Sequence, residues 1–243
     1  MNRTICMLMV MVLAGLAGPA RALDAAQLLE KIDQVEYAAE DSVAEVRVVL
    51  YESGGQKSER RMKMWQKGNE RRLIRFEKPA DVRGIGFLDV AGKMYVYFPA
   101  FHKVRRVAGS VKNQNFAGTD FAHSDLSSER FSKRLQAVKL EKQDKCWLLT
   151  AREKDGDSPY SRLVFRVRPD FLFDRVEYYD RAGNLWKVFE RQDFRPVGKY
   201  RQSYRVSMTD KKKNHRTEMI VEKLEMDTGL KDSFFSKRRL KRF

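Results

Sequence analysis

Short runs in which apolar and polar residues alternate make up most of this chain, and this period-two pattern limits its fold more than any other feature. Turn signals separate the runs, among them Gly-Gly at 54–55, Lys-Gly-Asn at 67–69, Ala-Gly-Lys at 91–93 and Ala-Gly-Asn at 182–184. Alternation places successive side chains on opposite faces of a strand, and tight turns join neighbouring strands as hairpins. The sequence therefore predicts an antiparallel meander.

The two faces of the predicted strands differ in chemistry. One face is apolar, whereas Lys and Arg occupy many positions of the other, as Arg162, Arg166 and Arg168 do. A long sheet of this kind curls around its apolar face to bury it. No linker, repeat or low-complexity stretch divides the chain. We expect a single domain over residues 23–243 with a mainly β (α+β) fold: a strongly curved sheet or partly open barrel with a few helices.

A helix is predicted over residues 24–40, ahead of the strands. Asp24 can cap it, and Gln27 three residues later completes a capping box. Apolar residues then fall on one helical face at 3.6-residue spacing: Ala25, Leu28, Leu29, Ile32, Val35 and Ala39. Such a stripe predicts contact with the core of the protein.

Residues 1–22 have the three parts of a secretory signal: a positive Arg3, an apolar run over 5–16, and small residues around a cleavage point after Ala22. The alternative, an N-terminal anchor helix, is disfavoured because the run is too short to span a bilayer comfortably. We therefore predict a cleaved signal and a periplasmic protein. Its one remaining cysteine, Cys146, can form no intramolecular disulfide and is expected to be buried and inert.

The chain carries a formal net charge of +16, with basic clusters at Lys211, Lys212 and Lys213 and in the C-terminal KRRLKRF. Export argues against nucleic acid as a partner, and no nucleic-acid-binding motif is present. Anionic lipid headgroups or an acidic protein surface fit the charge better. We predict transient docking on an anionic membrane surface, or on a protein partner, through Lys211, Lys212, Lys213, Arg238, Arg239, Lys241 and Arg242. The alternative is that these charges are simply solvated.

The meander is interrupted once, between about Ala108 and Arg134, where alternation stops and a helical turn is indicated near DLSSERF. A segment of this length inside a sheet protein usually crosses the structure or covers something. It contains Asp120, His123 and Asp125 within six positions. These residue types can bind a metal, and Ser124 beside them has the chemistry of a nucleophile.

The spacing of these residues supports neither reading. It matches no compact metal-ligand pattern, His102 and His215 have no obvious carboxylate cluster, and adjacent residues cannot easily adopt triad geometry. We expect an architectural role: Gly118 permits a tight bend, while Asp120 and Asp125 accept hydrogen bonds from backbone N–H groups. We predict no catalytic residue, metal site or cofactor, which disfavours a secreted hydrolase.

Four stretches together resemble the outer-membrane lipoprotein-sorting protein family, which is LolA-like and related in fold to RseB-type periplasmic sensors. They are RFEKPADVRGIGFL, MYVYFPAFHKVRRV, NFAGTDFAHSDL and the ending FFSKRRLKRF. The third matches a family loop of the form F-x-G-[ST]-D-[FW]-x-x-x-D-L at Phe116, Gly118, Thr119, Asp120, Phe121, Asp125 and Leu126. The resemblance covers essentially the whole chain after residue 22.

The resemblance implies a half-open β-barrel whose concave apolar face is covered by helices and loops and holds acyl chains. It implies a carrier of lipid or lipoprotein acyl chains between two membranes, not an enzyme, with an inner-membrane RND/MMPL-type transporter as a partner. We expect the protein to be a monomer. A non-catalytic accessory subunit that senses lipid or lipoprotein for such a transporter is the alternative. The identity of the cargo is left open.

Two residue sets follow from the alternation and the resemblance together. The predicted cargo cavity is lined by Val48, Met62, Met64, Ile74, Phe76, Met94, Val96, Phe98, Phe116, Phe121 and Phe165. The predicted lid is formed by Phe116, Gly118, Asp120, Phe121, Asp125 and Leu126. Methionine suits such a lining because its flexible thioether adapts to variable shapes. The competing interpretation, that the cavity set is ordinary packed core, is what apolar alternation usually means.

Overall fold

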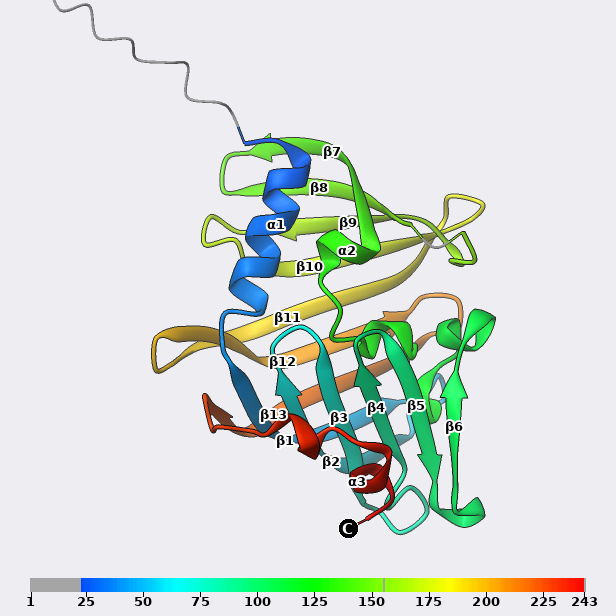
Figure 1. The fold of residues 1–243 in the computed structure, drawn as a ribbon. Helices are drawn as coiled ribbons and strands as arrows, with labels where there is room; N and C mark the ends of the chain where they lie inside the picture. The colour runs from blue at the N-terminus through cyan, green and yellow to red at the C-terminus, as the bar shows by residue number, and fades with distance from the viewer. Residues whose placement is uncertain (1–22, 155, 243) are drawn as a thin grey trace, which may run out of the picture.

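A single antiparallel sheet dominates the structure, a computed structural model that describes residues 23–154 and 156–242 (Figure 1). Its strands are β1 (Asp41–Tyr51), β2 (Lys57–Lys67), β3 (Arg71–Lys78), β4 (Gly86–Val90), β5 (Lys93–Phe98), β6 (Lys103–Val107), β7 (Leu135–Gln143), β8 (Cys146–Glu153), β9 (Tyr160–Val167), β10 (Phe173–Asp180), β11 (Leu185–Val197), β12 (Tyr200–Asp210) and β13 (His215–Met226). Their spatial order is β6-β5-β4-β3-β2-β1-β13-β12-β11-β10-β9-β8-β7. The sheet curves without closing, which confirms the predicted half-open barrel.

The described helices and 3-10 turns lie in four places. Helix α1 (Ala25–Glu36) precedes the sheet, and α3 (Lys237–Lys241) follows it together with the 3-10 turn η5 (Asp232–Phe234). The turn η1 (Pro99–Phe101) connects β5 to β6. The others fall between β6 and β7: η2 (Gly109–Asn113), η3 (Phe116–Gly118), η4 (Ser124–Leu126) and α2 (Phe131–Arg134). The interruption predicted over 108–134 is therefore confirmed, and we call these residues the crossing segment.

Helix α1 begins as the sequence predicts, but it ends earlier. Asp24 accepts a hydrogen bond from the backbone N–H of Gln27, and the Gln27 side chain accepts one from the backbone of Asp24. The predicted extension to residue 40 is wrong, since the helix stops at Glu36. The backbone N–H of Glu40 instead donates to the Asp227 carboxylate at 2.9 Å, so the residues after α1 lead directly into β1.

The concave face of the sheet carries the main hydrophobic core. Leu28, Leu29 and Ile32 of α1 pack there against strand residues such as Leu149 and Phe165, and all five are at most 2% exposed. In Figure 1, α1 lies over β7 to β10. The other half of the concave face is covered by the crossing segment, whose Phe116, Phe121 and Leu126 belong to the same core.

A second, smaller core lies on the convex face, which the sequence predicted to be rich in Lys and Arg. Trp65, Leu73, Leu88 and Tyr97 point away from the main core and are covered by Phe235 and Leu240 near the C-terminus. Strand alternation explains the arrangement. Each of these four residues is adjacent in sequence to a residue that belongs to the main core or packs against it, so its side chain points to the opposite face. The C-terminal segment is therefore packed onto the outside of β2 to β5.

The predicted signal over residues 1–22, with its cleavage point after Ala22, lies outside the described residues. Within residues 23–154 and 156–242, no helix has the length and apolar character needed to cross a bilayer. Cys146 is a free cysteine and half-buried, so the expected full burial is wrong. It opens strand β8 directly after the β7–β8 turn, where the core does not reach it.

Candidate functional site

The three polar residues that mark the crossing segment point to three different partners. Asp125 accepts a hydrogen bond from the backbone N–H of Ala122 at 2.8 Å, as the architectural interpretation predicts. The Nδ1 atom of His123 lies 2.8 Å from the carbonyl oxygen of Gln114, and burial lowers the pKa of this imidazole. Asp120 faces strand β13 instead. The side chains do not converge on a shared metal or substrate position.

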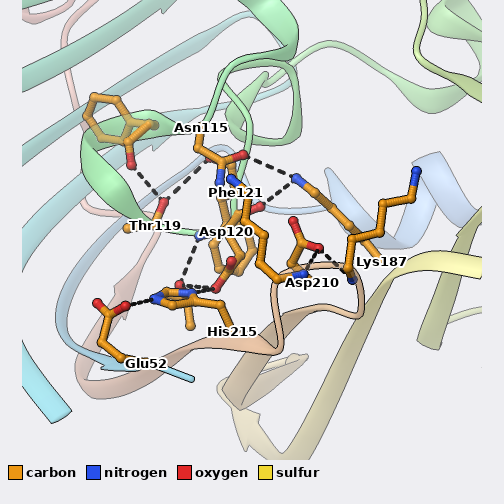
Figure 2. Close-up of polar contacts among 12 residues, drawn as sticks. Glu52, Asn115, Thr119, Asp120, Phe121, Lys187, Asp210 and His215 are labelled. Atoms are coloured by element: carbon orange, nitrogen blue, oxygen red, sulfur yellow. Dashed lines mark hydrogen bonds and ion pairs between the residues drawn. The ribbon is translucent and has the colours of Figure 1, made fainter. Parts of the chain in front are cut away.

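Asp120 forms the centre of a buried polar cluster with β13, not the backbone cap that we expected. Its Oδ2 accepts hydrogen bonds from the Oγ1 of Thr217 at 2.7 Å and lies 2.6 Å from the Nδ1 of His215 (Figure 2). The Nε2 of His215 in turn lies 3.2 Å from a carboxylate oxygen of Glu52. His215, for which the sequence showed no obvious carboxylate cluster, therefore lies between two carboxylates. Its partners are too distant in sequence for spacing to reveal them.

A buried lysine holds the same loop from strand β11. Lys187 is 1% exposed, and its Nζ donates to the carbonyl oxygen of Asp120 at 2.8 Å and to Oδ1 of Asn115 at 3.3 Å. Figure 2 shows this side chain reaching the crossing segment from the side opposite His215. Because a buried ammonium is costly without acceptors, this geometry fixes the position of the loop relative to the sheet.

Two arginines and a tyrosine from outside the crossing segment complete its attachment, and Arg134 closes a contact within it. Arg60 donates to the carbonyl of Ala117, Arg72 to that of Leu126 at 3.0 Å, and Arg134 to that of Ser124 at 2.7 Å. The Tyr37 hydroxyl donates to the carbonyl of Glu129 at 3.0 Å, and burial raises its pKa to about 12. The segment is thus a fixed cover over one half of the concave face.

A cavity of about 290 Å³ lies between this cover, the end of α1 and the inner face of the sheet. Pockets for small molecules occupy roughly 300–1,000 Å³, so this one lies at the lower end. Phe121, Asp125 and Leu126 of the crossing segment form part of its wall. Most of its apolar lining comes from the sheet: Ala44, Val46, Met64, Phe189, Val206, Met219, Val221, Leu224 and Met226.

Of the eleven residues predicted to line a cargo cavity, Met64 and Phe121 line this one. The remaining nine belong to the concave-face core or pack against it: Val48, Met62, Ile74, Phe76, Met94, Val96, Phe98, Phe116 and Phe165. Phe116, for example, has its ring centroid 5.7 Å from those of Phe76 and Phe87. These nine residues form the packed surroundings of the cavity rather than its wall. A role for any of them in holding cargo stays a prediction.

Sequence reasoning missed most of the actual lining, which comes from β11, β12 and β13. In β13, Met219 and Val221 face inward, but so do Leu224 and Met226, because a bulge shifts the register opposite Glu45 and Val46. A bulge adds one residue and reverses the phase of the alternation. The alternating Met, Val and Leu in TEMIVEKLEM were the available signal.

One rim of the cavity is polar. Arg191 forms an ion pair with Glu36 at the end of α1, and its side chain is 7% exposed. The guanidinium lies 4.8 Å from the ring centroid of Phe173, which also lines the cavity. Since a desolvated ion pair with an aromatic neighbour is held firmly, this contact links α1 to the sheet across the cavity.

The predicted docking residues fall into two separate groups. Lys211, Lys212 and Lys213 form the exposed β12–β13 turn, where Lys212 lies 2.6 Å from the carboxylate of Asp180. Arg238, Arg239, Lys241 and Arg242 are exposed on or just after α3, on the convex face. The buried Leu240 between them anchors this second group to the sheet.

A family model described only as "Uncharacterized protein" matches residues 68–242. The chain belongs to this family. A solved structure from Desulfovibrio piger, described as a DUF1329 family protein, superimposes with a TM-score of 0.80 at 27% identity and covers 89% of this chain and 97% of its own. No curated protein matches the sequence.

The family has the fold of lipoprotein-sorting proteins. A Vibrio parahaemolyticus domain named for outer membrane lipoprotein sorting matches with a TM-score of 0.79 at 28% identity, over 90% of this chain and 100% of its own. A LolA superfamily protein from Nitrosomonas europaea matches with a TM-score of 0.75 at 20% identity, over 90% and 100%. The predicted LolA-like resemblance is therefore confirmed, and this member of the family places its cavity on the concave face.

Proposed function

We propose that this LolA-like protein is a periplasmic, non-catalytic carrier that holds an acyl chain of a lipid or lipoprotein in its concave cavity. The observation that carries the proposal is the cavity itself: an apolar, methionine-containing hollow under a fixed cover, in the fold of proteins named for lipoprotein sorting. Among the described residues, no group of His, Cys, Asp and Glu could hold a metal ion.

The energetics of lipid transfer explain why such a cavity is useful. Each methylene exposed to water costs roughly 0.8 kcal/mol, so a chain of about 16 carbons resists leaving a membrane by about 13 kcal/mol. A soluble carrier lowers this barrier by offering apolar contacts in place of water. The partly exposed Met64, Met219 and Met226 supply such contacts and adapt to chains of different shape.

The proposal includes two further partners, an anionic membrane surface and an inner-membrane transporter of the RND/MMPL type. The full chain carries +16, and the positive charge left after removal of Arg3 and Arg21 with the predicted signal supports approach to anionic surfaces. The transporter rests on the family resemblance alone. A protein that sensed lipid for such a transporter would use the same cavity, so the two roles differ in whether cargo moves between membranes.

Native mass spectrometry of the protein, purified gently from a periplasmic extract, is the first test. We expect a reproducible added mass that solvent extraction identifies as a lipid or acylated peptide. An apo mass alone, with no displacement of a fluorescent fatty-acid probe, would overturn the carrier proposal. Transfer of the extracted lipid between two vesicle populations then separates a carrier from a sensor.

A substitution in the lining tests the cavity directly. Val221 lines the cavity, whereas Ile220 beside it in β13 points to the opposite face of the sheet. Val221→Trp should fill the cavity and weaken binding of a fluorescent fatty acid by tenfold or more, about 1.4 kcal/mol. Ile220→Trp is the matched control and should leave the affinity unchanged. Equal affinities for the two variants would place the binding site elsewhere.

A further inference from the structure

One end of the sheet combines an exposed aromatic side chain with a group of cations. It is formed by the end of β3 with the β3–β4 connection (residues 77–85), the β5–β6 connection (99–102) with the start of β6, and residues 237–242. Figure 1 shows these segments together at the bottom of the molecule, beside the C-terminus. A hollow there is lined jointly by residues of all three, including Lys78, Arg83, Pro99 and Lys241. We call this region the basic end.

Phe101 is the most exposed large hydrophobic residue of the basic end. Its side chain is 64% exposed, whereas every other aromatic side chain in residues 23–154 and 156–242 is buried or half-buried. The preceding Phe98 packs against the main core. His102, in the left-handed conformation with φ at 49°, ends the short turn that displays Phe101. Singly exposed apolar side chains are common on protein surfaces, so Phe101 is informative only together with the charges around it. Burying it against a partner would contribute roughly 1.5–3 kcal/mol.

The charges around Phe101 are predominantly positive. Lys78, Arg83, Lys103, Lys241 and Arg242 are all exposed, and within the described part of the chain none forms an ion pair with a carboxylate. The nearby carboxylates are Glu77 and Asp81. With the exposed Lys237, Arg238 and Arg239 of the same end, cations outnumber acidic groups among these described segments, which gives the basic end a positive potential.

Protection of the sheet edge does not account for this combination. Edge strands often carry Lys or Arg to prevent pairing with other chains, and β6 is an edge strand. The opposite edge strand, β7, meets the same need with charges of both signs, since Lys139 and Glu141 form an ion pair at 2.8 Å. Edge protection requires neither a single sign of charge nor an exposed aromatic ring at the turn.

We propose that the basic end docks on the surface of an anionic phospholipid bilayer. Phe101 inserts among the headgroups, while Lys78, Arg83, Lys103 and Lys241 contact lipid phosphates. The inference rests on the proposed carrier function, because a carrier has to meet a bilayer to load or release its cargo. It assigns docking to the basic end, including the residues after α3, and not to the Lys211–Lys213 turn.

Flotation with vesicles tests the assignment without any cargo. The probe-free protein should bind vesicles that contain phosphatidylglycerol and should bind vesicles of phosphatidylcholine alone far more weakly. Phe101→Ser should lower binding to the anionic vesicles roughly fivefold. Its matched control is Val138→Ser on β7, which removes another exposed hydrophobic side chain, 49% exposed, from the opposite edge. Both variants should unfold at the same temperature as the parent protein.

The charges are tested with paired reversals. Lys103→Glu with Lys241→Glu should lower binding about twentyfold or more, at about fivefold for each cation. The control pair, Lys211→Glu with Lys213→Glu, changes net charge equally and should have a markedly smaller effect. An equal effect of the two pairs, or binding unchanged by Phe101→Ser, would overturn the docking site. Vesicle binding without fatty-acid binding would instead refute the carrier function and leave the docking surface standing.

Discussion

His215 holds the crossing segment to β13 from a position 95 residues away from its partner Asp120. Burial lowers the pKa of this imidazole, but the hydrogen bonds and charges of Asp120 and Glu52 outweigh burial, so the pKa of His215 is raised. A raised pKa in the folded state means that the imidazolium stabilises the protein. This contribution is complete below the unfolded pKa of about 6.5 and is lost as pH rises through the folded value.

The pH dependence of His215 can be measured as a difference between variants. His215→Gln should lower the free energy of unfolding by about 1–3 kcal/mol at pH 6 and by less at pH 8.5. His102→Gln, at an exposed turn, is the matched control for exchanging a histidine for glutamine. Urea titrations at the two pH values give both differences. A loss for His215→Gln that is constant with pH would show that the imidazole acts here in its neutral form.

At the scale of single residues, the sequence predicts local partners and misses remote ones. The contact of Asp125 with Ala122 was predictable, because turns place such groups within hydrogen-bond reach. The role of Asp120 was not, since His215 and Thr217 approach it only through pairing of the whole sheet. The family loop motif therefore identified Asp120 as a structural residue, but its contacts with β13 could not be predicted from the motif.

Among the elements, the crossing segment depends on an unusual backbone at its first turn. Ala117 and Gly118 both have positive φ, at 48° and 76°, and Arg60 donates to the carbonyl of Ala117. Gly118→Val should strain this turn, because β-branched residues rarely adopt positive φ. We expect a loss of about 1–2 kcal/mol in stability and faster release of a bound fatty-acid probe.

The control for Gly118→Val is Gly55→Val in the β1–β2 turn. Gly55 also has positive φ, at 79°, and a side chain added there meets nothing within 4 Å. Both variants should be destabilised to a similar extent, but only Gly118→Val should change the rate of probe release in a stopped-flow measurement. Unchanged release for both would mean that the first turn of the crossing segment does not retain the ligand.

The boundaries of the crossing segment were predictable because the alternation of apolar and polar residues stops at its start and resumes at its end. The helix α1 was located for a similar reason, since Asp24 and Gln27 form a local capping signal. The C-terminal segment was not, because its apolar Phe235 and Leu240 lie within a basic run that resembles a solvated tail. Only the paired sheet shows that Phe235 and Leu240 pack on a second apolar surface, on its convex face.

For the whole molecule, the two cores on opposite faces of one sheet separate stability from ligand binding. Leu240 is fully buried on the convex face, away from the cavity. Leu240→Ala should destabilise the protein by about 2–4 kcal/mol through loss of buried methyl groups. Affinity for a fatty-acid probe should stay unchanged under conditions where the variant is folded. Leu240→Met, of similar volume, should restore most of the stability, and a parallel loss of affinity in Leu240→Ala would show that the two faces are coupled.

The position of β13 has a consequence for the order in which the chain can fold. Every strand pair except β1–β13 joins neighbours along the sequence, so two local meanders can form independently. The β1–β13 pair joins the two meanders. Because these strands come from opposite ends of the chain, forming this pair costs the entropy of closing the longest loop. During synthesis the edge of β1 that pairs with β13 therefore stays unpaired until the last strand has been made. A chaperone that protects the nascent protein from aggregation would act at this exposed edge.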